Sequence, residues 1–570
     1  MSLPEECDVL VVGSGGGGLL SAVRAHDNGL KVAVVEKSDR YGGTTAVAGG
    51  GIWIPNNDAI KDVDSPELAL TYLKAITDGQ VPEHKLKAYI ESAPKLVEYL
   101  MATLGIHYYH TAHYPDYRLE LPGALPIGRH MLPSPRDGRK LGDELFHLRE
   151  PQPYYRVLRK VHIDLADMGA LIQRPKGWKR QVFQLLSRYA LDVPWRFKSS
   201  RDRRLTFGNA LMAGLRQNML ERGIPLFLST PLDELVREDG AVTAAYVTYK
   251  GSRRRVAVRK GVILASGGFE KSQELRNREM GHTQVEWSIT PAPNTGDGLN
   301  AAEKIGAATE FLDKAWWCPS IRLPGPVMSS VDLRVGLFSD RALPHTVCVN
   351  RNGDRFANEA LNYNDFGWAM LADNEKTGAN LPCWIVFDAQ ARAKYPIGSI
   401  WPSAVKPDRF IPQDWWDNIL YRADTVRGLA EKIEVEPAKL EAVVQRMNHY
   451  ASTGIDEEFS RGESAYDRYF GDQRIMPNPN LGPIEKAPFY AMRLDLGDTG
   501  TKGGPKVDEY ANVLQADGTP IKGLYAVGNV AGSVMAGAYP GPGSTIGPAM
   551  VFGMVAADHI ARTTSNLPPR

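Results

Sequence analysis

The stretch CDVLVVGSGGGGLLSAVRAHDNGLKVAVVEK, residues 7–37, decides the fold. An apolar run, a cluster of glycines, a helix-like segment and a second apolar run predict a strand, a turn, a helix and a strand. The glycines have the spacing Gly13-x-Gly15-x-x-Gly18, and Glu36 ends the second run. This spacing lets a pyrophosphate approach the helix N-terminus, and the carboxylate can accept a ribose hydroxyl. The stretch therefore predicts a dinucleotide site formed by Gly13, Ser14, Gly15, Gly18, Glu36 and Lys37.

The next twenty residues indicate which dinucleotide is bound. SDRYGGTTAVAGGGIWIPNN, residues 38–57, places a second glycine-rich loop directly after the acidic residue. An NAD-binding chain continues at this point into another strand and helix, whereas a second loop that contacts phosphate and ring favours FAD. The candidate cofactor-binding residues in this loop are Gly43, Thr44, Thr45, Gly49 and Gly50.

Strand, glycine loop and helix recur later in the chain. GVILASGGFE (261–270) is an apolar run that ends in glycines, and PNTGDGL (293–299) opens a helix-like segment. KGLYAVGNVAG (522–532) is another such run, followed by the loop AYPGPGST (538–545) and a final helical segment. These motifs predict that both ends of the chain build one α/β domain. They add Gly267, Asp297, Gly528, Asn529, Ser544, Thr545 and Ile546 to the candidate cofactor-binding residues.

Composition restricts the class of protein. A chain of 570 residues is too long for one core, so we expect at least two domains. A net charge of +1 excludes a general attraction to nucleic acid, and the four scattered cysteines have no metal-ligand spacing. The first residues carry two glutamates and no cationic region, and no run of about 18 apolar residues occurs. We expect a cytoplasmic protein without a metal site or signal peptide.

The ordered glycine motifs resemble, over nearly the whole chain, the succinate dehydrogenase and fumarate reductase flavoprotein superfamily. The resemblance implies a Rossmann-like FAD-binding domain split between 1–279 and 491–570, around an α+β catalytic domain at 280–490. Members that bind flavin covalently carry a histidine where this chain has Thr44 and Thr45, so the FAD is expected to be non-covalent. Members that act on dicarboxylates carry an arginine where this chain has Tyr539, and a phenol suits a neutral carbonyl.

Three segments are similar to a narrower family, the 3-ketosteroid Δ1-dehydrogenases: GDTGTKGG (497–504), GLYAVGN (523–529) and YPGPGSTIGPAMVFG (539–553). By this resemblance the Tyr539 hydroxyl and the Gly543 amide bind the C3 carbonyl oxygen of the steroid. A second family tyrosine follows a GxRFxNE segment, and NGDRFANEALNYNDF (352–366) places Tyr363 there. A third precedes a Pro-Gly pair, and YPDYRLELPGA (114–124) offers Tyr117, with Tyr114 as the alternative.

These residue types suit one reaction. The C2 hydrogen beside a ketone is a weak acid, so two donors aimed at the C3 oxygen stabilise the enolate that develops. A base must then remove the C2 proton. Tyrosine titrates near pH 10, so Tyr363 can serve only as a stabilised phenolate, which a hydrogen bond from Tyr117 would provide. The hydride from C1 is expected to go to N5 of the flavin.

Residues 150–204 look inserted into the flavin domain. Ten Lys or Arg stand against two Asp between Arg174 and Arg204, and apolar residues at 178, 182, 185, 186 and 189 follow helical spacing. A basic helix with aromatic residues on its apolar face is typical of a membrane interface, which predicts membrane contact through 174–198. An apolar face packed against the flavin domain or a second subunit is the alternative. Membrane contact favours poorly soluble substrates such as cholest-4-en-3-one.

Several questions stay open on the sequence alone. A 3-ketosteroid Δ4-(5α)-dehydrogenase would use the same cofactor with a base placed differently, and a flavin-loaded, membrane-associated sterol-binding protein would not react at all. The electron acceptor is external, and a quinone fits an enzyme resting on the inner face of the membrane. Lys502, in TKGG, fits either a flavin neighbour or a solvated loop, and it is left out of the catalytic set.

Overall fold

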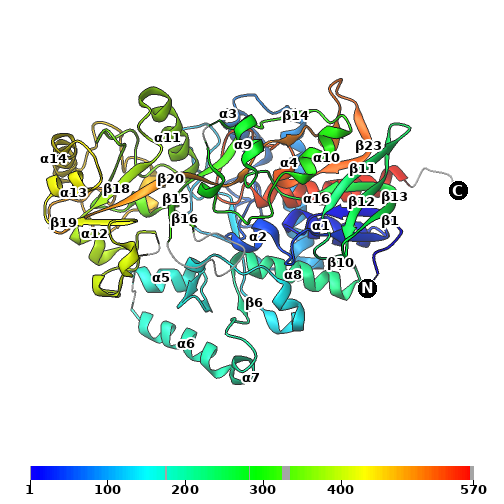
Figure 1. Cartoon of the computed structure of the whole chain (residues 1–570), viewed down its shortest axis with the longest axis horizontal. Helices are drawn as coiled ribbons and strands as arrows, with labels where there is room; N and C mark the ends of the chain where they lie inside the picture. The colour runs from blue at the N-terminus through cyan, green and yellow to red at the C-terminus, as the bar shows by residue number, and fades with distance from the viewer. Residues whose placement is uncertain (1, 174–175, 282, 324–333, 399, 565–570) are drawn as a thin grey trace.

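The computed structural model describes residues 2–173, 176–281, 283–323, 334–398 and 400–564, so Arg174 and Pro175 of the predicted basic segment lie outside the described residues. Two main sheets lie toward opposite ends of the long axis of the molecule (Figure 1). The N-terminal strand and the final helix both lie at the end that carries the larger sheet.

The larger sheet is built from both ends of the chain, as the glycine motifs predict. The predicted first strand and helix are β1 (Glu6–Val12) and α1 (Gly16–Asp27), and every side chain of β2 (Val32–Val35) is buried. β1 pairs in parallel with β2 and β13 (Ser252–Leu264), and β13 pairs in parallel with the late strand β23 (Pro520–Ala526). The remaining strands of this sheet are β10 (Leu226–Phe227), β11 (Leu232–Glu238), β12 (Ala241–Tyr249) and β22 (Asn512–Leu514).

The helices α1 and α16 (Ile546–Thr564) pack against each other beside this sheet. They can approach closely because Gly17 has no side chain: a Cβ there would lie 2.8 Å from the carbonyl oxygen of Ala549. Farther along the pair, Arg24 Nε donates to Asp558 Oδ1 at 2.6 Å. α8 (Phe207–Glu221), buried along most of its length, packs on α1 as well.

The smaller sheet has six strands that pair antiparallel around the long strand β20 (Phe489–Thr501). β20 still pairs in this sheet at Thr501, opposite Ala315, so a division by sheets would set the second domain boundary after residue 501 instead of 490. Its other strands are β15 (Ala315–Arg322), β16 (Arg334–Gly336), β17 (Thr346–Val349), β18 (Cys383–Phe387) and β19 (Leu420–Ala423), and nearby helices are α11 (Tyr363–Thr377), α13 (Val426–Lys432) and α14 (Pro437–Thr453).

The inserted segment forms the helices α5 (Leu165–Gln173), α6 (Trp178–Leu191) and α7 (Val193–Arg196), which extend away from both sheets (Figure 1). The predicted apolar spacing does give a helix, but that face packs inward: Leu185 is buried in one cluster with Val161 and Ile163. Other apolar side chains of the inserted segment reach the surface. Among them are Phe183, Leu191 and Phe197, which are 71%, 76% and 88% exposed. Among the described helices, not one has the length and apolar character needed to span a bilayer.

Smaller elements complete the surroundings of the site. A three-stranded sheet is formed by β3 (Ile52–Trp53), β4 (Tyr108–His110) and β5 (His130–Pro133). Short helices follow the glycine loops, namely α2 (Gly43–Val47) and α10 (Asp297–Lys304). The four cysteines are buried and free, and no cluster of metal-binding side chains occurs within the ranges that the structure describes.

Candidate active site

The turn between β1 and α1 requires its glycines for different reasons. Gly13 has a φ of 107°, and a Cβ there would lie 2.4 Å from the carbonyl oxygen of Ala265. A Cβ on Gly18 would lie 2.2 Å from the oxygen of Gly13, so this glycine serves the packing of helix on strand. A Cβ on Gly15 would meet nothing closer than 3.8 Å, which leaves the turn accessible to a phosphate.

Glu36 directly follows β2 beside this turn and is held in place by Ser14 and Ser38. Its carboxylate accepts hydrogen bonds from Ser14 N (3.0 Å), Ser14 Oγ (2.6 Å) and Ser38 N (2.9 Å). A carboxylate offers about four acceptor positions, so Glu36 retains capacity for a ribose hydroxyl. Lys37 Nζ pairs with Asp297 Oδ2 at 2.7 Å, which joins two of the predicted cofactor residues.

One cavity of about 1900 Å³ connects the glycine turn to the predicted catalytic residues. Ligand cavities commonly measure about 300–1,000 Å³, so this one has room for a dinucleotide and a second ligand. Gly18 and Ser544 do not line it: Ser544 Oγ instead donates to the oxygen of Gly541 at 2.7 Å. The predicted cofactor residues that line it are Gly13, Ser14, Gly15, Glu36, Lys37, Gly43, Thr44, Thr45, Gly49, Gly50, Gly267, Asp297, Gly528, Asn529, Thr545 and Ile546. The shape and donors of this cradle fit FAD.

Three tyrosines from distant parts of the chain meet in the same cavity. The ring centroids of Tyr117 and Tyr363 are 5.8 Å apart, those of Tyr117 and Tyr539 5.1 Å, and those of Tyr363 and Tyr539 5.3 Å. The carbonyl of Pro540 accepts hydrogen bonds from Tyr117 N (2.9 Å) and the Tyr72 hydroxyl (2.7 Å), which fixes one loop against the other. We call Tyr117, Tyr363 and Tyr539 the tyrosine cluster.

Gly543 and Tyr539 are the candidate donors of the loop that follows β23. Gly543 has a φ of 95°, and a Cβ there would lie 2.5 Å from the carbonyl carbon of Ile52, so the backbone can approach only as glycine. Burial raises the pKa of Tyr539 to about 12, while the Tyr363 and Thr545 hydroxyls and the Gly543 N–H act to lower it. Tyr539 and Gly543, four residues apart in one loop, both line the cavity.

Tyr363 opens helix α11, where the side chain of Asn362 accepts from Asp365 N at 3.0 Å. Burial raises the pKa of Tyr363 well above 10, and the Tyr117 hydroxyl acts to lower it. That hydroxyl is buried without a hydrogen-bond partner among the described residues. Buried polar groups are normally paired, so an unpaired one in a cavity indicates a place where a ligand or a proton binds.

Tyr114, the alternative to Tyr117, also lines the cavity but has different neighbours. Its ring contacts are with His130 and Tyr469, each 5.1 Å away, and with Phe470. Burial raises its pKa, and the Tyr117 hydroxyl again acts to lower it. Because Tyr117 contacts the rings of both Tyr363 and Tyr539, its position matches the predicted supporting role better.

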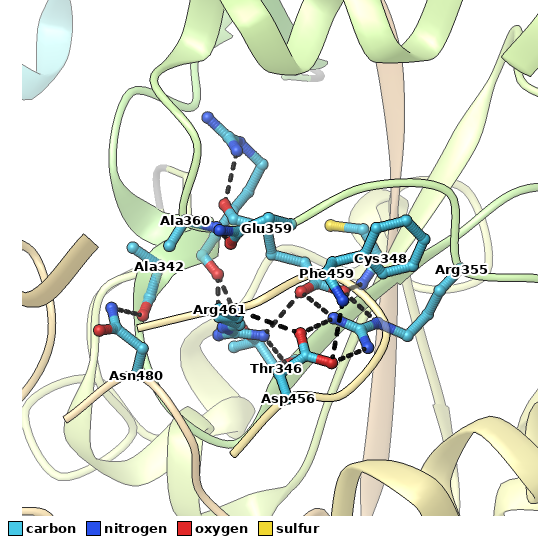
Figure 2. Close-up of polar contacts among 12 residues, drawn as sticks. Ala342, Thr346, Cys348, Arg355, Glu359, Ala360, Asp456, Phe459, Arg461 and Asn480 are labelled. Atoms are coloured by element: carbon cyan, nitrogen blue, oxygen red, sulfur yellow. Dashed lines mark hydrogen bonds and ion pairs between the residues drawn. The ribbon is translucent and has the colours of Figure 1, made fainter. Parts of the chain in front are cut away.

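The segment that leads into Tyr363 is held by a cluster of buried charges, which we call the ion cluster: Arg355, Glu359, Asp456 and Arg461 (Figure 2). Arg355 donates to both oxygens of Glu359 (3.0 and 2.9 Å) and both oxygens of Asp456 (2.9 and 2.8 Å). Arg461 donates to Glu359 at 3.2 Å and to the oxygen of Thr346 at 2.8 Å. Although burial opposes ionisation, both arginines keep the pKa of Glu359 below its usual range.

The prediction missed a buried lysine behind the tyrosine cluster. Lys502 is 0% exposed, and its Nζ lies 4.0 Å from the centre of the Trp316 ring, which in turn packs on Tyr539 at 4.8 Å. Trp316 and Phe338, whose ring is 5.0 Å from Tyr363, were missed as well. The only available signal was the pair of glycines after Lys502, which indicates a close approach of backbone without showing what approaches.

Comparison with known proteins gives matches over the whole chain. The FAD binding domain family matches residues 8–546. A 3-oxosteroid 1-dehydrogenase of Mycolicibacterium smegmatis is 39% identical, with 98% of each chain covered. The crystal structure of 3-ketosteroid delta1-dehydrogenase from Sterolibacterium denitrificans, in complex with 1,4-androstadiene-3,17-dione, superposes with a TM-score of 0.95 at 46% identity and covers 98% of this chain and 100% of that one.

A third likeness concerns the alternative reaction. The crystal structure of 3-ketosteroid-delta4-(5alpha)-dehydrogenase from Rhodococcus jostii has a TM-score of 0.65 at 18% identity, with 98% of both chains covered. An identity this low shows a shared fold and leaves the position of the base open.

Proposed function

Because this chain belongs to the FAD-dependent 3-oxosteroid 1-dehydrogenase family, we propose that it removes one hydrogen each from C1 and C2 of a 3-ketosteroid. The observation that carries the proposal is the meeting of Tyr117, Tyr363, Tyr539 and Gly543 in one cavity with the glycine turn. A neutral donor pair and an unpaired phenol suit a ketone, and none of these residues offers the charge that a dicarboxylate requires.

The ketone oxygen would be held by the Tyr539 hydroxyl and the Gly543 N–H. Both donors are fixed before the substrate arrives, because Pro540 is bound by Tyr117 and Tyr72 and the Gly543 backbone rests on Ile52. Donors that need no reorganisation stabilise a developing enolate more than they stabilise a neutral ketone. The pair therefore increases the acidity of the C2 hydrogen.

Tyr363 is the proposed base for the C2 proton. It stands 5.3 Å from Tyr539 between ring centroids, so a steroid A ring held by Tyr539 has its C2 side near the Tyr363 phenol. The unpaired Tyr117 hydroxyl would donate to the Tyr363 phenolate and so lower its pKa. Bound FAD, held without a covalent bond, supplies the redox chemistry by accepting the hydride that leaves C1.

Apolar residues that line the cavity in addition to the tyrosine cluster support a substrate with an apolar side chain, such as cholest-4-en-3-one. They include Leu165, Met168 and Leu171 of α5, together with Trp401 and Val405. An apolar lining favours an apolar ligand.

The exposed apolar side chains of the insertion support docking on an anionic membrane surface. Phe183, Leu191 and Phe197 project into solvent beside the exposed cations Arg180 and Lys198. This combination of apolar and basic side chains binds the headgroup region of a bilayer. An enzyme docked in this way could take its sterone from lipid and pass electrons to a membrane quinone, and we propose this peripheral location on the inner face of the membrane.

The docking surface is tested by flotation with vesicles that contain anionic lipid. Replacing Phe183, Leu191 and Phe197 together by serine should abolish most of the binding, because each aromatic or leucine side chain contributes roughly 1.5–3 kcal/mol when buried. A matched control replaces Val63, Ile455 and Met476, exposed apolar residues outside the insertion. Equal losses in both triple variants, or unchanged flotation of the first, would contradict the proposal.

The reaction itself is tested under anaerobic conditions. The purified flavoprotein is mixed with cholest-4-en-3-one or with androst-4-ene-3,17-dione, the visible flavin band is followed, and the new double bond is located by NMR. Bleaching with a C1–C2 double bond supports the proposal, and a higher kcat/KM for the sterone supports the side-chain preference. From 5α-reduced substrates, a C4–C5 double bond would favour the Δ4-(5α) alternative, and no bleaching with any of them would favour a binding protein.

A further inference from the structure

The buried ammonium group of Lys502 lies between the two segments that carry the proposed acid–base groups. Its Nζ donates to the oxygen of Ala538 at 2.6 Å and to that of Gly537 at 2.8 Å. It also donates to Asn364 Oδ1 at 3.5 Å. Ala538 precedes Tyr539 and Asn364 follows Tyr363, so one cation connects the neighbours of both tyrosines.

All the groups that surround this nitrogen are acceptors. Two carbonyls, one amide oxygen and the face of Trp316 at 4.0 Å leave no donor for the lone pair of a neutral amine. Burial lowers the pKa of Lys502 well below its usual range, and Lys314 acts in the same direction, whereas the nearby Asp365 acts to raise it. The geometry fits the charged form, because each of its three protons has an acceptor.

The cation has no partner to neutralise it at close range. Within the described residues, no carboxylate lies within ion-pair distance of Lys502, although most other buried cations of this chain have one. Its centre of charge is 5.9 Å from the centre of the Tyr539 ring. A buried charge left without a counter-ion is costly, so its retention indicates a role that needs the charge.

We propose that Lys502 is a positioning residue that fixes Tyr539 relative to Tyr363 and that its charge stabilises the negative charge formed on the steroid oxygen and the Tyr363 phenolate. The inference rests on the proposed function. The influences on the pKa of Tyr363 come from burial and from the neighbouring tyrosines. The Tyr363 phenolate that removes the C2 proton becomes neutral as the negative charge passes to the steroid oxygen, so the reaction keeps an anion in this apolar environment. The Lys502 cation, 5.9 Å from the centre of the Tyr539 ring, acts strongly on that anion.

The test uses the FAD-loaded protein and two ligands that do not react. A steroid with a phenolic A ring, 17β-oestradiol, presents an ionisable oxygen to Tyr539 and Gly543, and androsta-1,4-diene-3,17-dione presents a neutral ketone. Their dissociation constants are measured from the shift of the flavin spectrum. In Lys502→Met the phenolic ligand should bind about 10- to 100-fold more weakly, and the diketone should change by less than about threefold.

We also expect kcat in Lys502→Met to fall about 100-fold with KM within about threefold, because the charge acts on the Tyr363 phenolate and the enolate and not on the neutral ketone. Lys85→Met is the matched control, since Lys85 is also buried but pairs with Glu310 outside the cavity lining. If Lys502→Met loses its flavin spectrum, Lys502→Gln replaces it in the test, because glutamine keeps a donor for the loop carbonyls without the charge. Lys502→Gln should still bind the phenolic ligand more weakly relative to the diketone.

The results separate the role of Lys502 from the proposed dehydrogenase function. Equal effects of the Lys502 and Lys85 variants on the ratio of dissociation constants would overturn the role of Lys502 and leave the dehydrogenase intact. A loss of both ligands in equal measure by Lys502→Gln would reduce the lysine to a structural support and overturn the role of its charge. A wild-type protein that binds neither steroid would overturn the proposed function, and the inference with it.

Discussion

The ion cluster and the tyrosine cluster are both buried, and they lie before and at the start of helix α11, yet they differ in how their acidic groups are paired. In the ion cluster the carboxylates of Glu359 and Asp456 are each bound by arginine (Figure 2). In the tyrosine cluster the Tyr117 hydroxyl has no partner among the described residues, and burial raises the pKa of all three phenols.

This difference separates support from function. Paired charges on Arg355 fix where the segment before Tyr363 lies, at a cost in desolvation that only complete pairing offsets. The unpaired Tyr117 phenol destabilises the protein without ligand, and a substrate that supplies the missing partner recovers that free energy on binding. We therefore expect changes in the tyrosine cluster to affect rates and changes in the ion cluster to affect stability.

The largest effect is expected from Tyr363→Phe. Loss of the base should lower kcat about 10³-fold or more, within the range that general bases contribute, while the flavin spectrum and steroid affinity stay within about threefold of wild type. Stopped-flow bleaching of the flavin measures the chemical step directly. A chemical step slowed by less than tenfold would assign the base to another group.

The next effect concerns stability. Glu359→Gln leaves Arg355 and Arg461 facing a neutral amide, and breaking a buried ion pair costs about 3–5 kcal/mol in unfolding free energy. Denaturant unfolding of the flavoprotein measures it. Glu458→Gln is the control, because Glu458 binds the same Arg355 at 2.9 Å with a side chain that is 30% exposed, so about 1 kcal/mol or less is expected. Equal losses would show that burial of the cluster is unimportant.

The smallest effect is expected from Tyr117→Phe. The reaction needs the phenolate of Tyr363, so the rate should rise with pH until that group has ionised. Removing the Tyr117 hydroxyl removes an influence that lowers the pKa of Tyr363, so the rising limb should move to higher pH and the rate at neutral pH should fall about tenfold. Tyr114→Phe is the comparison, and a larger shift from it would assign the supporting role to Tyr114.

The sequence was sufficient to predict a structural element wherever one short segment determines that element. Residues 7–37 predict β1, α1 and β2 because the apolar periods and the glycine spacing act over a few residues. The tyrosines were found by resemblance of their flanking segments, since no periodicity in the chain relates positions 117, 363 and 539. Their ring contacts became visible only in the fold.

The predictions that changed depend on long-range packing. The apolar face of α6 was assigned to a membrane, and it packs instead on β7 (Arg156–Val157), β8 (Val161–His162) and α5, leaving Phe183 outside. Lys502 was left out of the catalytic set, because its sequence fits a flavin neighbour or a solvated loop equally and a charged side chain is normally exposed. Its acceptors at Gly537 and Ala538 are 35 and 36 residues away in the chain, beyond what a local pattern encodes.

The joining of the chain's two ends has a consequence for biosynthesis. The glycine turn at Gly13 leaves the ribosome 532 residues before Thr545, which lines the same cavity together with Ile546. β1 likewise lies one strand away from β23 in the finished sheet. The cofactor can be enclosed only after Thr545 and Ile546 have been made, so a stop codon that removes α16 should yield a chain unable to retain flavin, however much of the rest has folded.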